Sequence, residues 1–238
     1  MMRTYSPFLL LCFLGVVACS STLDVGDDQN DGGAQGPGPA GAKRMFVTST
    51  AYTGNLAAHG HGETVSPEND PGANGADKLC QAAATAGRLG GTWKAWISSH
   101  SPDQDPATTA HHALDRIADV AGGWYNVDRT KLLFTNKANL VTMPSQEAWS
   151  TADELTIALK DESGRRLERG TLVWTGTTTG GRLASADCLS WTDDQDRNGG
   201  SKGTVGVVGK EPSTWTDDSG RGLGAECEHA AHLYCLEQ

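Results

Sequence analysis

The chain has 238 residues, with 19 basic against 29 acidic side chains and a formal net charge of −10 at pH 7. This acidic balance argues against nucleic acids, anionic lipid surfaces and heparin-like polyanions as partners bound through charge. The six cysteines divide by position into two groups. Cys12 and Cys19 lie in an amino-terminal apolar segment, and four lie in the body of the chain: Cys80, Cys188, Cys227 and Cys235.

The amino terminus has the pattern of an export signal. Arg3 precedes an apolar stretch, Phe8 to Ala18, which is shorter than the roughly 20 apolar residues of a membrane-spanning helix. The stretch ends in Val-Val-Ala-Cys at 16–19, and this motif resembles the lipobox of bacterial lipoproteins. The resemblance implies cleavage of a signal peptide at 1–18 and acylation of Cys19 by two or three chains of the palmitate type. An ordinary signal peptide cut nearby is the alternative.

Acylation would provide a durable anchor, because each buried methylene contributes about 0.8 kcal/mol and several chains act together. Ser20 follows Cys19, where an aspartate would be the retention pattern of inner-membrane lipoproteins. The sequence therefore predicts a protein that is exported and lipid-anchored to the bacterial cell envelope, at the outer membrane. Whether it faces the periplasm or the exterior stays open.

A composition change separates a tether from a folded domain. Residues 19–44 are rich in Gly, Asp and Pro, and such a segment buries too little apolar surface to offset the entropy of ordering. We expect a disordered linker there. Apolar periodicity begins at Met45 and continues to the terminus, which predicts one domain over 45–238, long enough to bury a core.

Short apolar runs between glycine-rich turns predict a loop-rich α+β fold for this domain. A helix at 75–87 is indicated by Asn74-Gly75 at its start and Gly87 at its end. The other expected elements are strands at 46–52, 92–98, 172–175 and 232–236 and a second helix at 107–121.

Three segments carry a family resemblance. They are GADKLCQAAATAGRLGGTWKAWISS at 75–99, LVWTGTTTGGRLASADCLSW at 172–191 and CEHAAHLYCLE at 227–237. Together they resemble endostatin, the C-terminal domain of collagens XV and XVIII. The resemblance covers most of 45–238 and implies a C-type-lectin-like, endostatin-like fold.

The resemblance also implies a disulfide pairing. Four cysteines permit three pairings, and the endostatin-like one is nested, joining Cys80 to Cys235 and Cys188 to Cys227. On the chain-entropy model the inner loop, of about 40 residues, would contribute about 4 kcal/mol. We expect these bridges to attach the last strand to the first helix and to leave 176–226 as closed surface loops, in a compartment outside the cytosol.

An acidic loop is the strongest candidate for a metal site. Asp194, Asp196 and Asn198 alternate before Gly199, and such oxygen ligands on a tight turn suit Ca²⁺. Val205 stands where a complete EF-hand loop has a bidentate glutamate. Calcium is therefore a candidate cofactor, and a solvated acidic turn is the alternative.

A second cluster is partly similar to the sugar-binding motifs of C-type lectins. It includes Glu211 in Glu-Pro-Ser and Trp215, Asp217 and Asp218 in Trp-Thr-Asp-Asp. These four residues are candidate ligand contacts, although Asp218 lies farther from Cys227 than in that family. Trp215 could stack on a sugar ring or simply anchor the loop.

Histidines suggest a weaker metal candidate. His59, His61 and Glu63 lie where endostatin has an amino-terminal zinc site, but the aspartate of that site corresponds to Thr130 here. We expect four further histidines to be solvent-facing or structural. These are His111 and His112, which should face solvent, and His229 and His232, which should be structural.

Other endostatin properties do not transfer. The helix that should carry an arginine cluster for heparin has only Arg116, beside Asp115 and Asp119. Among the tryptophans, we expect Trp93, Trp96, Trp174 and Trp191 in the core and Trp124, Trp149 and Trp215 in loops.

Enzymatic signatures such as G-x-S-x-G, H-E-x-x-H or a P-loop do not occur in the sequence. The sequence thus predicts a non-enzymatic surface lipoprotein. Its leading interpretation is a binding or adhesion module that recognises an extracellular protein or glycan through the 176–226 loops. The alternative is a structural, envelope-organising protein without a small ligand.

Overall fold

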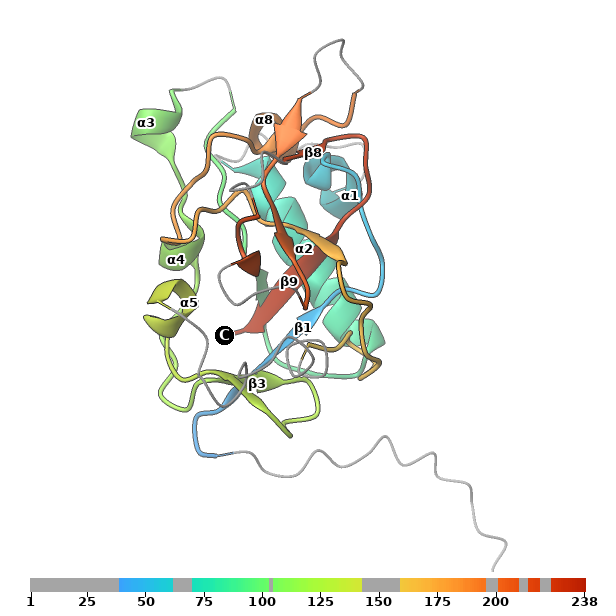
Figure 1. The fold of residues 1–238 in the computed structure, drawn as a ribbon, viewed down its shortest axis with the longest axis vertical. Coiled ribbons are helices and arrows are strands. Elements are labelled where there is room, and N and C mark those ends of the chain that lie inside the picture. Colours follow the sequence, from blue (N-terminus) through green and yellow to red (C-terminus); the bar gives the residue numbers. More distant parts are fainter. Residues whose placement is uncertain are drawn as a thin grey trace, which may run out of the picture. The chain divides into compact units, whose positions relative to one another are not determined.

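The structure is a computed structural model that describes residues 39–61, 70–102, 105–142, 159–195, 201–209, 214–218 and 224–238. All of them belong to one compact unit, Gln35–Gln238. They form a mixed α/β fold around a curled sheet (Figure 1). The expected signal peptide, Cys19 and most of the expected linker lie outside the described residues. Within the described ranges, no helix has the length and apolar character needed to cross a bilayer.

The last strand, β9 (His232–Glu237), is the centre of the sheet. On one edge it pairs antiparallel with β1 (Lys43–Val47), so that Phe46 lies opposite Cys235. On the other edge it pairs with β2 (Trp93–Ala95) and β5 (Leu172–Trp174). The sheet continues beyond β1 to β3 (Trp124–Asn126) and β4 (Leu132–Phe134), and beyond β5 to β7 (Val205–Val207).

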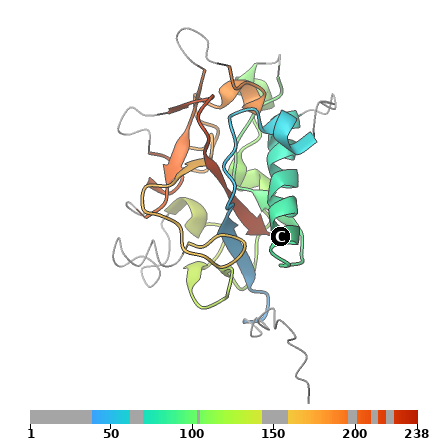
Figure 2. The same cartoon turned by 90° about the vertical axis from the view of Figure 1, so that its right-hand side faces the viewer.

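Both faces of the central strands are buried, because side chains alternate across a strand. Met45 and Val47 contribute to one hydrophobic cluster, while Phe46 between them contributes to the other. The second cluster lies under α2 (Pro71–Ala86), which runs alongside the sheet in Figure 2. A strand that is buried on both faces has consecutive apolar residues in the sequence. Met45 to Val47 of β1 and Leu233 to Leu236 of β9 are such runs.

Tryptophans fill both clusters. The four predicted in the core are buried, which confirms that expectation: Trp93, Trp96, Trp174 and Trp191. The loop placement was wrong for Trp124, which lies in β3 and is fully buried. Trp215 lies outside the described helices and strands, as expected, but it too is buried, at 3 % exposed. Trp149 lies outside the described residues.

Helix α2 begins four residues before its expected start at Gly75. The Asp70 carboxylate accepts a hydrogen bond from the Ala73 amide at 3.1 Å, and Pro71 occupies the first turn. An aspartate cap followed by proline is a common helix start, so the signal was present in the sequence. A short helix, α1 (Leu56–His61), precedes α2 and packs against it.

The single helix expected at 107–121 does not form. Two short helices take its place, α3 (Pro106–Thr109) and α4 (Ala113–Arg116), and Ala110 between them has an extended backbone. His111 there exchanges two backbone hydrogen bonds with Ser99, at 3.0 and 2.8 Å. This long-range pairing outweighs local helix propensity. Farther along, α5 (Asn139–Thr142) is a single turn.

The two ends of the domain are joined by a buried ion pair. Arg44 donates from Nε to Glu237 at 2.7 Å and from Nη2 to the other carboxylate oxygen at 3.1 Å, and both side chains are nearly inaccessible. Such a bidentate pair is geometrically demanding. Because Arg44 and Lys43 belong to β1, the folded domain starts slightly before the expected boundary at Met45.

Both disulfides have the nested pairing that the resemblance implied. Cys80 of α2 is bonded to Cys235 of β9, and Cys188 to Cys227. The expectation that 176–226 consists of surface loops is only partly right. The segment contains β7, a two-stranded sheet of β6 (Lys202–Gly203) and β8 (Ala225–Glu226), and the turn α8 (Cys188–Trp191).

Candidate functional site

A pocket with a cavity volume of about 420 Å³ opens in the region enclosed by the Cys188–Cys227 bridge. A cavity of this size falls in the range of small-molecule sites. Its walls come from β5, β6, β7, β8 and the segments next to them. The residues that the following argument uses are Leu172, Lys202, Val205, Asp218, Glu226 and His229.

The exposed fraction of each lining residue shows how deep in the pocket it lies. Val205 and Asp218 are buried, at 3 % and 6 % exposed, whereas Leu172, Lys202 and His229 are exposed. The inner part of the pocket is thus lined by an aliphatic residue and an acidic one. The charged and polar side chains of Lys202 and His229 lie toward solvent.

Asp218 is positioned by a tryptophan three residues before it. The Trp215 ring packs against three aromatic rings, with centroids 5.2 Å from Trp96, 4.9 Å from Phe134 and 5.2 Å from Tyr234. Aromatic contacts of this kind contribute beyond their buried area. They fix the short described segment 214–218 to the core of the domain.

Polar contacts complete the attachment of this segment. The Trp96 indole donates to Thr216 Oγ1 at 2.7 Å, and Thr175 Oγ1 donates to the Thr216 carbonyl at 2.6 Å. The Asp218 amide then donates to the Val205 carbonyl at 2.9 Å. These buried hydrogen bonds are costly to leave unmade, so the backbone that carries Asp218 is well defined beside β7.

The wall formed by β6 and β8 brings opposite charges together. Lys202 lies opposite Glu226 in the two-stranded sheet, and the Lys202 ammonium is 3.4 Å from the Glu226 carboxylate. Gly203 beside Lys202 has no room for a side chain, because a Cβ would lie 2.8 Å from the Trp174 ring and 2.9 Å from Cys188 Sγ. The close approach of these elements therefore requires glycine.

The turn α8 has an unusual backbone. Its four residues all have positive φ, from 51° at Cys188 and Leu189 to 62° at Trp191, so it is a left-handed turn. Such a conformation costs roughly 1–2 kcal/mol per non-glycine residue. The Cys188–Cys227 disulfide fixes the first residue of this turn. At its last residue, the Trp191 indole donates to the Ser98 carbonyl at 2.8 Å.

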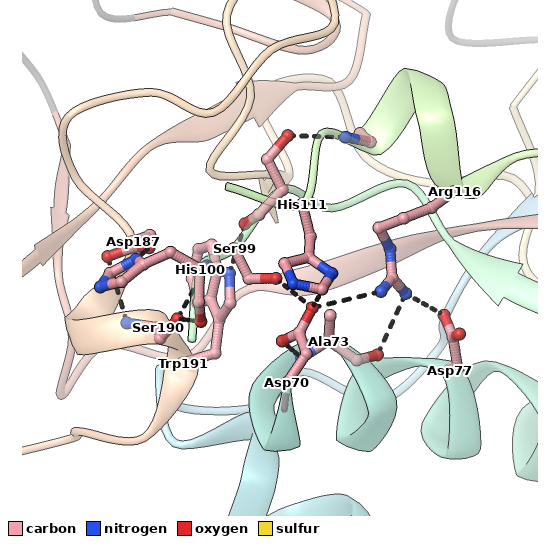
Figure 3. A network of polar contacts seen from close by, with 12 residues as sticks. Asp70, Ala73, Asp77, Ser99, His100, His111, Arg116, Asp187, Ser190 and Trp191 are labelled. Atoms are coloured by element: carbon pink, nitrogen blue, oxygen red, sulfur yellow. Dashed lines mark hydrogen bonds and ion pairs between the residues drawn. The ribbon is translucent and has the colours of Figure 1, made fainter. Parts of the chain in front are cut away.

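A network of polar contacts supports the left-handed turn (Figure 3). The His100 ring is 2.7 Å from one oxygen of Asp187, and the other Asp187 oxygen accepts from the Ser190 amide at 3.1 Å. The Ser190 hydroxyl also contacts the backbone of His100. The network thus ties the turn to the segment that follows β2.

The other part of Figure 3 centres on two carboxylates, the buried Asp70 that caps α2 and the partly buried Asp77 in its first half. Asp70 accepts from the Ser99 hydroxyl at 2.6 Å, and Arg116 lies 3.5 Å from Asp70 and 2.8 Å from Asp77. Burial raises the pKa of Asp77, and the nearby Arg116 guanidinium opposes this rise. His111, 3.6 Å from Asp70, is partly exposed rather than fully solvent-facing as expected.

This network contains serine, histidine and aspartate, but its arrangement does not expose a nucleophile. Ser99 and Ser190 are completely buried, and each hydroxyl is engaged within the fold. A nucleophile has to reach its substrate and a base. We therefore regard the network as a support of α8 and α2, and the pocket as the candidate functional site.

Of the four predicted ligand residues, the pocket includes one. Asp218 lines it, Asp217 is partly exposed next to it, and Glu211 lies outside the described residues. The suggestion that Trp215 stacks on a sugar ring is wrong, because the ring is 3 % exposed and packed among core aromatics. Trp215 has the alternative role, that of an anchor.

The calcium prediction falls largely outside the described residues, since Asp196 and Asn198 are not among them. Asp194 accepts from Thr53 Oγ1 at 3.2 Å and from Gln195 Nε2 at 3.2 Å. Among the side chains that the structure describes, no three His, Cys, Asp or Glu residues are grouped to hold a metal ion. Calcium binding at 194–198 stays a prediction.

The proposed zinc residues are distributed as follows. His59 and His61 lie in α1, where His59 contacts the Thr53 hydroxyl at 2.8 Å, and Glu63 is outside the described part of the chain. Thr130 donates its hydroxyl to Asp128 at 2.7 Å. Burial alone would raise the pKa of Asp128, but hydrogen bonds from Lys160 and Thr130 outweigh it and lower that pKa.

Two of the remaining histidines differ in role. His232 Nδ1 is 2.6 Å from the Thr48 carbonyl, a structural contact as expected. His229 is exposed and lines the pocket, so its structural assignment was wrong. Sequence reasoning also missed Leu172, Lys202 and Glu226 as pocket residues. The pairing of β6 with β8 brings Lys202 to Glu226, and that of β5 with β7 places Leu172 beside Val207; no local motif indicates either pairing.

Comparison with known proteins places the chain in a family. No curated protein matches it. The sequence profile of one family, described as "Protein of unknown function (DUF1554)", matches residues 64–208, which is more than half of the chain. The match includes Val205 of the pocket and one cysteine of each disulfide, but ends before Asp218. The chain therefore belongs to the DUF1554 family of proteins of unknown function.

Proposed function

We propose that this protein is a binding module, held at the bacterial cell envelope by a lipid on Cys19, that recognises its ligand with the pocket at Asp218. The observation that carries the proposal is the pocket itself. Its buried part is lined by Val205 and Asp218. A concave, mostly aliphatic cavity with a few convergent polar groups is the usual form of a ligand site.

The rigid attachment of the pocket supports a binding role. Trp215 fixes the segment that carries Asp218, and the Cys188–Cys227 bridge joins α8 to the chain next to β8. A site that is ordered before binding loses less conformational entropy on binding. A segment that only connected β5 to β9 would not need a disulfide and a left-handed turn to fix its conformation.

The fold is assigned, as part of the proposal, to the endostatin-like, C-type-lectin-like class. Two observations support it. The disulfides have the nested pairing of that class, and the chain between β5 and β9 forms a long excursion that contains the pocket. Fold alone does not establish function, so the pocket carries the functional argument.

Export and anchoring are proposed from the amino-terminal motif Val-Val-Ala-Cys at 16–19. If Cys19 is the lipidated residue, radioactive palmitate will label the full chain, and a Cys19→Ala variant will lose both the label and its membrane association. A Cys12→Ala variant is the matched control and should keep both. A variant without Cys19 that still carries palmitate and stays in the membrane would contradict the anchor.

The binding role is tested by blocking the pocket. Ala230, an exposed residue of its lining, is replaced in Ala230→Trp, and Ala107→Trp places the same side chain on exposed α3 as a control. Both variants and the unmodified protein are screened against surface proteins and glycans, with calcium and with a chelator. We expect a ligand that Ala230→Trp no longer binds.

An identical binding profile for both tryptophan variants would instead favour the envelope-organising alternative, in which no small ligand group enters the pocket. A ligand lost only in the presence of chelator would assign recognition to the predicted calcium loop. These outcomes separate the pocket from the rest of the 176–226 region.

A further inference from the structure

We propose that the Cys188–Cys227 bridge, here called the inner bridge, is a redox-sensitive switch. A protein dithiol in the same compartment reduces it, the left-handed turn α8 relaxes, and the pocket wall beside the bridge loosens. The effect on ligand binding rests on the proposed function of the pocket. The outer bridge, Cys80–Cys235, lacks the features that point to this role.

The backbone around the two bridges differs. Cys80 lies within the right-handed helix α2 and Cys235 within the strand β9, which are ordinary backbone conformations. Cys188 is the first residue of α8, in which all four residues have positive φ. A left-handed backbone is unfavourable for every residue that has a side chain. Reduction of the inner bridge therefore allows α8 to leave an unfavourable conformation, whereas reduction of the outer bridge brings no such gain.

Access to the two bridges differs in the same direction. All four cysteines are buried, but the residues next to them are not alike. Leu189, which follows the first cysteine of the inner bridge, is 54 % exposed, and Glu228, which follows the second, is also exposed. Tyr234 and Leu236, on either side of Cys235, are inaccessible. A local opening at the surface is therefore enough for a thiolate to reach the inner bridge.

The inner bridge is in direct contact with the pocket wall formed by β6 and β8. Cys227 directly follows Glu226 of β8, and its amide donates to the Ser201 carbonyl at 3.0 Å. Gly203 of β6 packs so closely on the other half of the bridge that a Cβ there would lie 2.9 Å from Cys188 Sγ. A displacement of either cysteine therefore changes the position of a strand that lines the pocket.

Backbone contacts link α8 to the same wall. Asp187, which caps the turn, forms an isolated bridge with Gly203 of β6. The Thr204 amide donates to the Ala186 carbonyl at 2.7 Å, just before the turn. After the turn, the Asp193 amide donates to the carbonyl of the first cysteine at 3.1 Å. Relaxation of α8 removes these contacts, so the pocket wall loses its fixed geometry.

The reaction is thiol–disulfide exchange. A thiolate of the dithiol attacks one sulfur of the inner bridge and forms a mixed disulfide, while the other cysteine leaves as a thiolate and takes up a proton. The second thiol of the dithiol then displaces the first cysteine. The products are two cysteine thiols in this protein and one disulfide in the reductant, so two electrons have passed to the bridge.

The first experiment compares the two bridges in the purified full chain at fixed ratios of reduced to oxidised dithiothreitol. Free thiols are alkylated at equilibrium and mapped by mass spectrometry. We expect the inner bridge to be half reduced at a ratio at least about tenfold lower than the outer bridge, a difference of about 30 mV. If both bridges open together, or Cys80–Cys235 opens first, the proposal is wrong.

A pair of variants tests the role of the left-handed turn. Leu189 is exposed and has a φ of 51°, a value that glycine adopts without steric cost. Leu189→Gly should therefore raise the ratio needed to reduce the inner bridge, by about twofold to fivefold. The control, Leu189→Ala, removes the same apolar side chain but keeps a Cβ, and should leave the ratio unchanged. Equal ratios for the two variants would contradict the role of the turn.

Hydrogen exchange locates the change in conformation. When only the inner bridge is reduced, we expect the amides of Asp193, Thr204 and Cys227 to lose protection by about tenfold or more. The amides of Thr48 and Trp96, which donate to carbonyls of β9, should keep theirs. Loss of protection in both sets would indicate general unfolding, and loss in neither would indicate a rigid bridge; each result would overturn the switch. A Cys188→Ser, Cys227→Ser double variant repeats the measurement without a reductant.

The switch and the proposed function fail differently. The screen of surface proteins and glycans is repeated with the inner bridge reduced, and we expect binding at the pocket to weaken by about tenfold or more. Equal binding by the oxidised and reduced forms would refute the switch and leave the binding function intact. If the exchange rates change as expected but neither form binds any surface protein or glycan, the binding function is wrong and the redox response stands.

Discussion

Two regions of this molecule reach their conformations by different means. The sheet region, formed by β1, β2, β9 and α2, is held by continuous apolar packing on both faces and by the buried Arg44–Glu237 pair. In the pocket region, residues 187–230, the described residues form only the short elements α8, β6, β7 and β8. This region depends on a few long-range attachments, namely the Trp215 ring, the Cys188–Cys227 bridge and the contacts around α8.

This difference in the number of stabilising contacts indicates which region can carry a binding site. In the sheet region most strand residues are buried in one of the two hydrophobic clusters, so each is held by many contacts and the loss of one has a small effect on the geometry of the others. In the pocket region a few contacts, chiefly those of the Trp215 ring and of Thr216, position Asp218, and the geometry of the site depends on them. Site geometry therefore depends on the Trp215 anchor, whereas changes in the sheet region should lower stability without altering the pocket, so mutations in the two regions should have different effects on binding.

Removing the anchor of the pocket region should have the largest effect. Trp215→Ala leaves a cavity among Trp96, Phe134 and Tyr234, and such truncations cost about 4 kcal/mol. We expect chemical denaturation to show this loss, and the amide of Asp218 to lose its protection from hydrogen exchange. Trp215→Phe, the control, should lose much less. Unchanged protection at Asp218 would contradict the anchoring role.

Breaking the ion pair of the sheet region should cost about 3 kcal/mol, because Arg44→Ala leaves Glu237 as a buried, unpaired charge. In contrast to the first variant, pocket binding should not change at temperatures where the protein stays folded. Denaturation and ligand titration of the same sample measure both quantities. Arg182→Ala, at an exposed arginine, is the control and should be nearly neutral.

A pH-dependent test examines the turn next to β1. Burial alone would raise the pKa of Asp161, but hydrogen bonds from Ser163 and Arg165 outweigh it and lower that pKa. Its ionised form therefore stabilises the fold above about pH 4, the usual carboxyl range, and this contribution is lost as pH falls through the folded-state pKa.

We expect Asp161→Asn to destabilise the protein by about 1–2 kcal/mol at pH 7. The difference from the unmodified protein should shrink as the pH falls from about 4 through the lowered folded-state pKa of Asp161, because the carboxyl then becomes protonated in the native state as well. Melting temperatures measured over this range check the prediction. A difference that is constant with pH would mean that the charge of Asp161 has no role.

The smallest effect is expected where the two regions meet, at Tyr234 of β9. Its ring contacts Trp215, and among the described residues its buried hydroxyl has no hydrogen-bond partner. Burial raises the pKa of this hydroxyl far above its usual range. Tyr234→Phe should therefore be neutral or stabilising by up to about 1 kcal/mol in denaturation experiments. A loss of stability would reveal a partner for the hydroxyl.

Sequence reasoning performed better for the sheet region than for the pocket region. The helix α2 and the strands β1, β2, β5 and β9 were expected near their observed positions, since apolar runs and helix ends are local signals. The helix expected at 107–121 failed because His111 pairs with Ser99, a contact that no local pattern encodes.

The candidate site could be located only coarsely. The enclosure of this region by the Cys188–Cys227 bridge indicated where the site should lie, and Asp218 was named as a candidate. For Trp215 the sequence left two roles open, a sugar platform and a loop anchor, and its burial agrees only with the anchor. The local sequence around a tryptophan between polar residues does not indicate whether its ring faces solvent or the core. The distinction depends on Trp96, Phe134 and Tyr234, which are distant in the chain.

By itself, the sequence determined the apolar elements of the sheet region, and through its resemblance to endostatin it indicated both disulfides. These features follow from local periodicity and from cysteine positions within recognisable segments. Only the tertiary structure decided the left-handed turn at 188–191, the burial of Trp215 and the joining of Asp218 with Lys202 and Glu226 in one pocket. The physical reason is that these features arise from contacts between residues far apart in the chain, and such contacts override local preference.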